Sequence, residues 1–265
     1  MPPAASHPTR FLTVASRAAR AAGALLAARA GRPRRVETKR NAIDLVTEVD
    51  RASERMIHRA VQAAFPAHGF QGEERTRTHP GAPYQWIVDP VDGTMNFVHG
   101  MPTFAVSIGL HHEGRPLAGV IYDPMRRELF SGLAGHGAWL NGVRIRVSRA
   151  PHLSTSLLST GFPSAFRRTP RRYLKPFEAF QSCCHGVRRM GCTTLSLAYV
   201  ACGRLEGFYE QHLWPWDIAA GMLLVQEAGG RLSDFRGRPA QLHRGELVAS
   251  NGLIHHEMLS HLTTV

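Results

Sequence analysis

The stretch Trp86-Ile-Val-Asp-Pro-Val-Asp-Gly-Thr-Met-Asn-Phe97 carries most of the structural information in this chain of 265 residues. Its apolar beginning predicts a buried strand that stops at Asp89. Asp92 follows three residues later, while Pro90 fixes the backbone between the two acids and Gly93 lets the chain bend. Two carboxylates on one tight turn repel each other unless a cation joins them, and hard oxygen ligands suit Mg²⁺. The alternative is an ordinary Asp-Gly turn in which Asp89 is only a cap.

Further acidic residues stand at loops or at the ends of expected elements. Glu73 and Glu74 lie together in a loop. Asp50 immediately precedes an expected helix, and Asp217 opens another. Each has an ordinary explanation, because paired glutamates are common on solvated surfaces and aspartate is a common helix cap. Active sites, however, are assembled at such loops and element ends.

Apolar periodicity predicts a mixture of helices and strands. The expected helices cover residues 11–30, 51–65, 193–201 and 217–228, with an Arg-rich helical segment after residue 160. The expected strands cover residues 43–46, 86–88, 105–111, 117–122, 128–133, 144–147, 157–160 and 207–210. Because strands and helices do not alternate strictly, the pattern favours layered sheets and helices over a doubly wound sheet.

The chain is strongly basic, with a formal net charge of +12. A nucleic-acid partner would suit this charge. Almost all of the positive charge is arginine, however, and Lys39 and Lys175 are the only lysines. The arginines are spread along the whole chain, as in a compositional bias, and the dense run at residues 167–175 fits either a solvated segment or an anion-binding patch. A nucleic-acid partner therefore stays open but is not favoured.

The cysteines and the apolar runs bear on compartment. Cys183, Cys184, Cys192 and Cys202 form no C-x-x-C pair, and vicinal cysteines are poor candidates for a disulfide framework. We expect a reducing, cytoplasmic compartment. No run reaches the roughly 18 consecutive apolar residues that span a bilayer, so no membrane span is expected.

The first 36 residues contain no acid and are rich in Ala and Arg, which is also the composition of a transit peptide. Residues 11–30 nevertheless carry an apolar stripe at helical spacing. We expect a disordered start at residues 1–9 followed by a structural helix, with a targeting signal as the alternative.

Four motifs, in this order, resemble the inositol monophosphatase family. They are Asp-Leu-Val-Thr-Glu-Val-Asp at residues 44–50, Gly-Glu-Glu at 72–74, the stretch 86–97, and Trp-Asp-Ile-Ala-Ala-Gly at 216–221. Segments 137–142 and 227–230 support the resemblance, which spans roughly residues 39–235. The combined signal is specific for the family and less specific for the substrate.

The resemblance implies a chain of the α/β class (α+β layered), folded as a five-layered α-β-α-β-α sandwich of the sugar-phosphatase type. It implies one domain over residues 10–265, with the metal site in the half that ends near residue 148 and a C-terminal half at 149–265. It also implies a homodimer, inhibition by lithium, and two or three bound Mg²⁺ ions.

The resemblance also assigns roles to residues. The implied metal ligands are Glu73, Asp89, the backbone carbonyl of Val91, Asp92 and Asp217. The implied catalytic set is Glu73 with Asp50 and Thr94, the last two of which orient and activate the attacking water. The implied substrate contacts are Gly93, Thr94, Gly191, Cys192, Thr193, Glu210 and Asp217. Lys39 and Glu74 are further candidates near the site. Arg75, Met95, Cys192 and Thr193 depart from the commonest family pattern, which puts the exact substrate in doubt.

The function implied is Mg²⁺-dependent hydrolysis of a polyol phosphate monoester, with inositol 1-phosphate as the expected substrate. This chemistry needs positioning and charge neutralisation more than a protein nucleophile, and a metal-activated water supplies the attack. Alternatives within the family are histidinol phosphate, a nucleotide bisphosphate and fructose bisphosphate. A hypothesis of a different class is a basic RNA- or transcription-associated binding protein.

Overall fold

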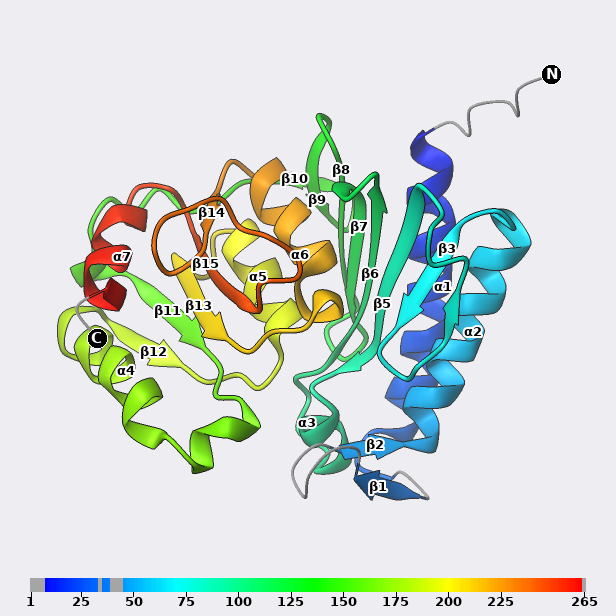
Figure 1. The fold of residues 1–265 in the computed structure, drawn as a ribbon, viewed down its shortest axis with the longest axis horizontal. Coiled ribbons are helices and arrows are strands. Elements are labelled where there is room, and N and C mark those ends of the chain that lie inside the picture. Colours follow the sequence, from blue (N-terminus) through cyan, green and yellow to red (C-terminus); the bar gives the residue numbers. More distant parts are fainter. Residues whose placement is uncertain (1–7, 33–34, 39–44, 264–265) are drawn as a thin grey trace.

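Helix α1 (Pro8–Arg29) packs beside α2 (Glu48–Ala64) on one face of a large sheet. The computed structural model describes residues 8–32, 35–38 and 45–263 (Figure 1). Along α1 the buried residues Phe11, Ala15, Ala18, Ala22 and Leu26 recur at helical spacing and form the face toward the sheet. Among the described residues, one segment of this helix, residues 9–29, is long and apolar enough by composition to cross a membrane. Its apolar stripe is buried in the protein core.

The large sheet has eight strands in the order β10-β9-β8-β7-β6-β5-β3-β4. Their bounds are β3 (Gly69–Gly72), β4 (Arg77–Thr78), β5 (Tyr84–Asp92), β6 (Ala105–His112), β7 (Arg115–Asp123), β8 (Glu128–Leu133), β9 (Gly137–Leu140) and β10 (Val143–Ile145). All neighbours pair antiparallel except β3 and β5, which are parallel. Glu113 and Gly114 join β6 to β7 with φ of 50° and 76°, as a tight hairpin turn of type I′ requires.

Two helices, α5 (Thr193–Ala201) and α6 (Pro215–Glu227), form the middle layer (Figure 1). Both are apolar on almost all sides because a sheet lies against each face of the layer. A Cβ at Gly109 would lie 2.8 Å from the Ala219 side chain, and one at Gly119 would lie 2.9 Å from the Ala220 carbonyl oxygen. These two glycines therefore let α6, which carries Asp217, approach the large sheet closely.

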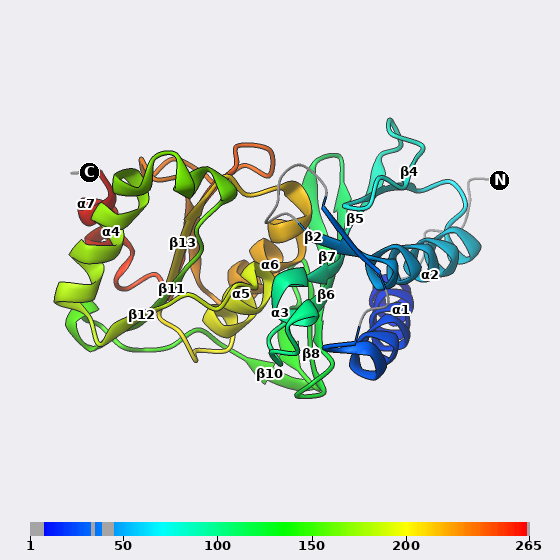
Figure 2. The same cartoon turned by 90° about the horizontal axis from the view of Figure 1, so that it is seen from below.

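The second sheet has five strands in the order β12-β11-β13-β15-β14. Their bounds are β11 (Leu157–Thr160), β12 (Gly186–Arg188), β13 (Gly207–Gln211), β14 (Arg231–Ser233) and β15 (Glu246–Ser250). Helices α4 (Pro170–Cys183) and α7 (His255–Thr263) cover its outer face, at the end of the molecule opposite α1 and α2 (Figure 2). Short elements complete the chain: β1 (Val36–Thr38), β2 (Leu45–Thr47), α3 (Thr94–Val98), and 3-10 turns at Leu153–Thr155 and Ser164–Arg167.

The layers run α-β-α-β-α, which confirms the predicted sandwich. Of the predicted disordered start, residues 1–7 lie outside the described residues, whereas Pro8 and Thr9 belong to α1. The division of the chain into domains stays a prediction.

Three of the predicted bounds that place acidic residues were wrong. Strand β5 does not stop at Asp89 but continues to Asp92, and its pairing with β6 shifts register between the two acids. Helix α2 begins at Glu48 rather than at residue 51, because the Thr47 side chain caps it. Helix α6 begins at Pro215 rather than at the predicted Asp217, so Asp217 stands in its first turn instead of opening it.

Candidate active site

The end of β5 and the start of α3 form the centre of the site, low in Figure 1. The Val91 N–H donates to Asp89 Oδ1 at 3.0 Å, and the Ser53 hydroxyl donates to the Pro90 carbonyl at 3.0 Å. Gly93 follows with φ +88°, and a Cβ there would lie 2.9 Å from the Thr103 carbonyl oxygen and 3.1 Å from that of Gly191. Three separate chain segments therefore meet at Gly93, and only glycine fits between them.

A fully buried carboxylate lies next to this bend. Asp50 is in the first turn of α2, where its Oδ2 accepts the Thr47 N–H at 2.8 Å and is also hydrogen-bonded by the Thr47 hydroxyl. The Thr94 hydroxyl lies 3.1 Å from Asp50 Oδ1 and 3.0 Å from the Val91 carbonyl oxygen, so its one proton is shared between two acceptors. The structure thus brings together Asp50 and Thr94, as predicted, although they are 44 residues apart.

Four predicted ligand side chains form a cluster of interacting carboxylates. Burial raises the pKa of Asp89 well above its usual range, and the negative charges of Glu73, Asp92 and Asp217 raise it further. Burial likewise raises the pKa of Asp217 well above its usual value, with Asp92 as the strongest charged contributor. Because the neighbouring carboxylates oppose the ionisation of Asp89 and Asp217, a cation among them would stabilise the charged forms of these two groups.

Asp92 is the member of the cluster that faces the second half of the chain. Its Oδ2 accepts the Thr194 N–H at 2.6 Å, the Thr194 hydroxyl at 2.7 Å and the Cys192 thiol at 3.1 Å. Burial raises the pKa of Asp92, and the Thr194 hydrogen bonds lower it. One carboxylate oxygen is thus fixed by the start of α5, and Asp92 links the two halves of the site.

The carboxylate oxygens of this cluster can be compared with the coordination that Mg²⁺ and Zn²⁺ require. Within residues 8–32, 35–38 and 45–263, no three His, Cys, Asp or Glu side chains already enclose a point at metal-binding distance. Mg²⁺ does not need such a cage, since it keeps several waters and is usually held by one or two carboxylates. The cluster of oxygen donors therefore fits hydrated Mg²⁺ and does not fit a closed zinc site, which needs four protein ligands.

A cavity of about 470 Å³ opens beside Asp92. Of the predicted substrate contacts, Gly191, Cys192, Thr193 and Glu210 line it, whereas Gly93, Thr94 and Asp217 do not. The Thr193 hydroxyl donates to Glu210 Oε2 at 3.0 Å. Burial raises the pKa of Glu210 to about 8, although the Thr193 hydrogen bond lowers it. Cys192 is buried and its thiol donates to Asp92, so this side chain supports the carboxylate cluster and is poorly exposed to a ligand in the cavity.

Asn96 was missed as a functional candidate. Its Nδ2 donates to the Thr103 carbonyl at 2.7 Å and to the Met190 carbonyl at 2.9 Å, which ties the loop before α5 to α3. The amide thereby positions Gly191 and Cys192. Its place two residues after Thr94 in the acidic motif was the available signal.

Glu54 was also missed. It is buried on α2, and its two carboxylate oxygens accept the N–H groups of Glu74 at 2.7 Å and Thr76 at 3.0 Å. This contact fixes the loop that carries Glu73. Glu54 lies four residues after Asp50 and three before the buried Ile57, so an acid on the apolar face of a helix was the signal.

A second hollow, of about 500 Å³, lies on the Glu73 side of the cluster. Its charged lining residues are Arg51, Glu73, Glu74, Arg75 and Arg77. The candidate Glu74 therefore borders the site. The candidate Lys39 lies outside the described residues and stays a prediction.

Comparisons with known proteins agree with this fold and motif order. The model of the inositol monophosphatase family matches residues 7–264. The Nus factor SuhB of Pseudomonas aeruginosa is 46% identical over 247 residues, which are 91% of this chain and 91% of that protein. The solved structure of the inositol monophosphatase from Anabaena (Nostoc) sp. PCC 7120 is 40% identical, with a TM-score of 0.88 over 97% of this chain and 96% of that chain. The crystal structure of extragenic suppressor protein suhB from Bartonella henselae is 37% identical, with a TM-score of 0.90 over 96% of this chain and 98% of that chain. The chain belongs to the inositol monophosphatase family.

Proposed function

We propose that this protein is a Mg²⁺-dependent phosphatase that hydrolyses the phosphate monoester of a small polyol, with inositol 1-phosphate as its preferred substrate. The observation that carries the proposal is the cluster of Glu73, Asp89, Asp92 and Asp217 beside the Asp50–Thr94 pair. Phosphoryl transfer requires that the phosphate charge be neutralised, which metal ions held by the carboxylates would do. It also requires a water positioned next to the phosphate.

The residues of the chain have separate tasks in this reaction. Mg²⁺ ions shared among Glu73, Asp89, Asp92, Asp217 and the Val91 carbonyl would neutralise phosphate charge and lower the pKa of a bound water. When the Thr94 hydroxyl donates to Asp50 Oδ1, the lone pairs of its oxygen are free to accept a hydrogen bond from the attacking water. Asp50 and Thr94 thereby orient the water. The water oxygen bonds to phosphorus and the water loses a proton, the phosphorus–oxygen bond to the polyol breaks, and the polyol oxygen takes up a proton, so that the products are inorganic phosphate and the polyol.

The polyol occupies the cavity beside Asp92 in this proposal. Thr193 and Glu210 offer a hydroxyl and a carboxyl group to its hydroxyls, and Gly93 and Thr94 lie on the phosphate side. Two or three bound ions, inhibition by lithium, a homodimer and a cytoplasmic location are further parts of the proposal, taken from the family resemblance and the free cysteines.

A substrate panel tests this proposal. Mg²⁺-dependent phosphate release is measured with inositol 1-phosphate, histidinol phosphate, 3′-phosphoadenosine 5′-phosphate and fructose 1,6-bisphosphate. We expect kcat/KM to be highest for inositol 1-phosphate. A clear preference for another compound would overturn the substrate, and no Mg²⁺-dependent turnover of any of them would overturn the phosphatase.

A binding role in RNA or transcription is the second candidate. It is favoured by the net charge of +12 and by the name of the Pseudomonas aeruginosa relative, a Nus factor. The phosphatase is preferred because a scaffold would not need the interacting carboxylates. Salt-dependent retention on RNA that survives Asp92→Asn would support the binding role, and no retention at physiological salt would dismiss it.

A further inference from the structure

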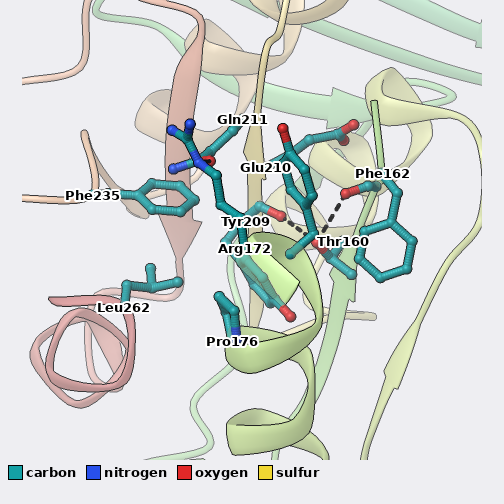
Figure 3. A pocket seen from close by; sticks show the side chains of 11 residues that line it. Thr160, Phe162, Arg172, Pro176, Tyr209, Glu210, Gln211, Phe235 and Leu262 are labelled. Carbon is teal, nitrogen blue, oxygen red and sulfur yellow. Dashed lines mark hydrogen bonds between the residues drawn. The ribbon is translucent and has the colours of Figure 1, made fainter. Parts of the chain in front are cut away.

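A third cavity, of about 230 Å³, lies in the C-terminal half between the five-stranded second sheet and helices α4 and α7 (Figure 3). Its apolar walls include Tyr173, Tyr209, Phe235 and Leu262. Arg172 and Gln211 also line it, and Figure 3 shows them together on one side. The cavity therefore has an apolar body and a cationic end.

The Arg172 guanidinium at the cationic end is held in place by Gln211. Arg172 Nε donates to Gln211 Oε1 at 3.2 Å, which leaves the four N–H groups on the two terminal nitrogens of the guanidinium for another acceptor. Within the described part of the chain, Arg172 forms no ion pair with a carboxylate. A planar guanidinium with two parallel N–H groups matches a carboxylate in a bidentate pair.

Glu210 also borders this cavity, so its charge must be considered. Its Oε2 accepts a hydrogen bond from the Thr193 hydroxyl. Thr193 lines the cavity beside Asp92, which is the proposed substrate pocket. In Figure 3 the Glu210 side chain extends away from Phe235 and Leu262. An anion held at Arg172, with its apolar part toward Phe235 and Leu262, thus lies on the other side from the Glu210 carboxylate.

The volume sets how large a group the cavity can enclose. An apolar cavity of about 150 Å³ is enough to hold benzene. A cavity of about 230 Å³ therefore has room for one six-membered ring and a carboxylate, and it is smaller than typical pockets for drug-sized ligands, which begin near 300 Å³. We propose that this cavity is a binding site for a small aromatic monocarboxylate, with the ring between Tyr209, Phe235 and Leu262 and the carboxylate on Arg172.

The site is distinct from the proposed catalytic centre but shares a wall with it. Thr160, Gly161, Phe162 and Glu210 line both this cavity and the substrate pocket. None of the metal-ligand candidates lines the new cavity. The binding proposal is therefore independent of the phosphatase proposal and can be tested without Mg²⁺ or substrate.

Benzoate is the probe, titrated by NMR against the full chain in Mg²⁺-free buffer. We expect saturable binding with a Kd of about 1 mM or tighter, as suits a ligand of this size. Arg172→Met should weaken binding at least about tenfold, because it removes the charge-assisted pair. The matched control is Arg171→Met, which like Arg172 is exposed but lies outside the cavity lining, and it should change Kd less than about twofold.

Two further measurements separate the contribution of the ligand's charge to binding from the contribution of the apolar cavity. Benzyl alcohol, which has the same ring and no charge, should bind at least about tenfold more weakly than benzoate. Leu262→Trp fills the apolar end and should abolish benzoate binding, with a thermal melt to confirm folding. Absence of saturable benzoate binding, equal binding by Arg172→Met and wild type, or equal binding of benzoate and benzyl alcohol would each overturn the proposal.

Discussion

The bend at Gly93 gives a quantitative test of the site geometry. Gly93→Ala places a methyl group 2.9 Å from the Thr103 carbonyl oxygen and 3.1 Å from that of Gly191, at a φ of +88°. Gly114→Ala is the matched control, since Gly114 has a similar φ of +76° but, among the described residues, no atom within 4 Å of its Cβ position. The control carries only the cost of a left-handed backbone, whereas Gly93→Ala carries that cost and two backbone clashes.

The expected magnitudes follow from these two terms. A left-handed conformation costs a non-glycine residue about 1–2 kcal/mol, so Gly114→Ala should lower the free energy of unfolding by about that amount. Overpacking against fixed atoms adds about 1–3 kcal/mol, so Gly93→Ala should lower it by about 2–5 kcal/mol in total. The difference between the two variants, about 1–3 kcal/mol, measures the close approach itself.

The assay is urea unfolding followed by tryptophan fluorescence, with both variants beside wild type. Mg²⁺-dependent phosphate release is measured on the same samples, and Gly93→Ala should lose activity while Gly114→Ala keeps it. If both variants lose the same unfolding free energy within about 0.5 kcal/mol, the three segments do not meet at Gly93 and the geometry of the site is wrong.

Three further predictions concern other parts of the molecule. Thr94→Val should lower kcat about 10²-fold with little change in KM, because it removes the hydroxyl that orients water, whereas the exposed Thr155→Val should leave kcat unchanged. Glu54→Gln should raise the Mg²⁺ concentration for half-maximal activity about tenfold, because the Glu73 loop loses a carboxylate anchor; an unchanged Mg²⁺ dependence would contradict this. Burial lowers the pKa of His255 to about 4 from 6.5, so the folded protein binds fewer protons than the unfolded chain between these values. Stability should therefore fall by up to about 3 kcal/mol as pH drops from 6.5 to 4, and urea unfolding of His255→Gln should show a shallower fall over that window.

The sequence predicted the elements near the acidic motifs more reliably than their bounds. Strand β8 was predicted with its observed bounds, because its apolar run is closed on both sides by turn residues. The continuation of β5 through Pro90 to Asp92 could not be predicted, because proline within a run of residues argues against a strand. The register shift between the two acids absorbs the irregularity, and only the pairing with β6 reveals it.

Hydrogen bonds between residues far apart in the sequence are the part of the site that apolar periodicity could not predict. Asp92 and Cys192 are 100 residues apart, and Asn96 and Met190 are 94 apart, yet both pairs form hydrogen bonds at the site. Local spacing carries no information on such pairs, so the resemblance alone suggested that residues 191–193 lie near Asp92. Glu54 was within reach of sequence reasoning, because an acid on the buried face of an amphipathic helix requires a partner.

The most direct test of the metal site is phosphate release from inositol 1-phosphate as a function of Mg²⁺ concentration, for wild type, Asp92→Asn and the exposed control Glu178→Gln. We expect Mg²⁺-dependent turnover in wild type and in the control. We expect a loss of at least about 10²-fold in Asp92→Asn, because the substitution removes one charge from the carboxylates proposed to hold the metal. Turnover that does not depend on Mg²⁺, or wild-type turnover in Asp92→Asn, would contradict the central claim that the end of β5 is the catalytic metal site.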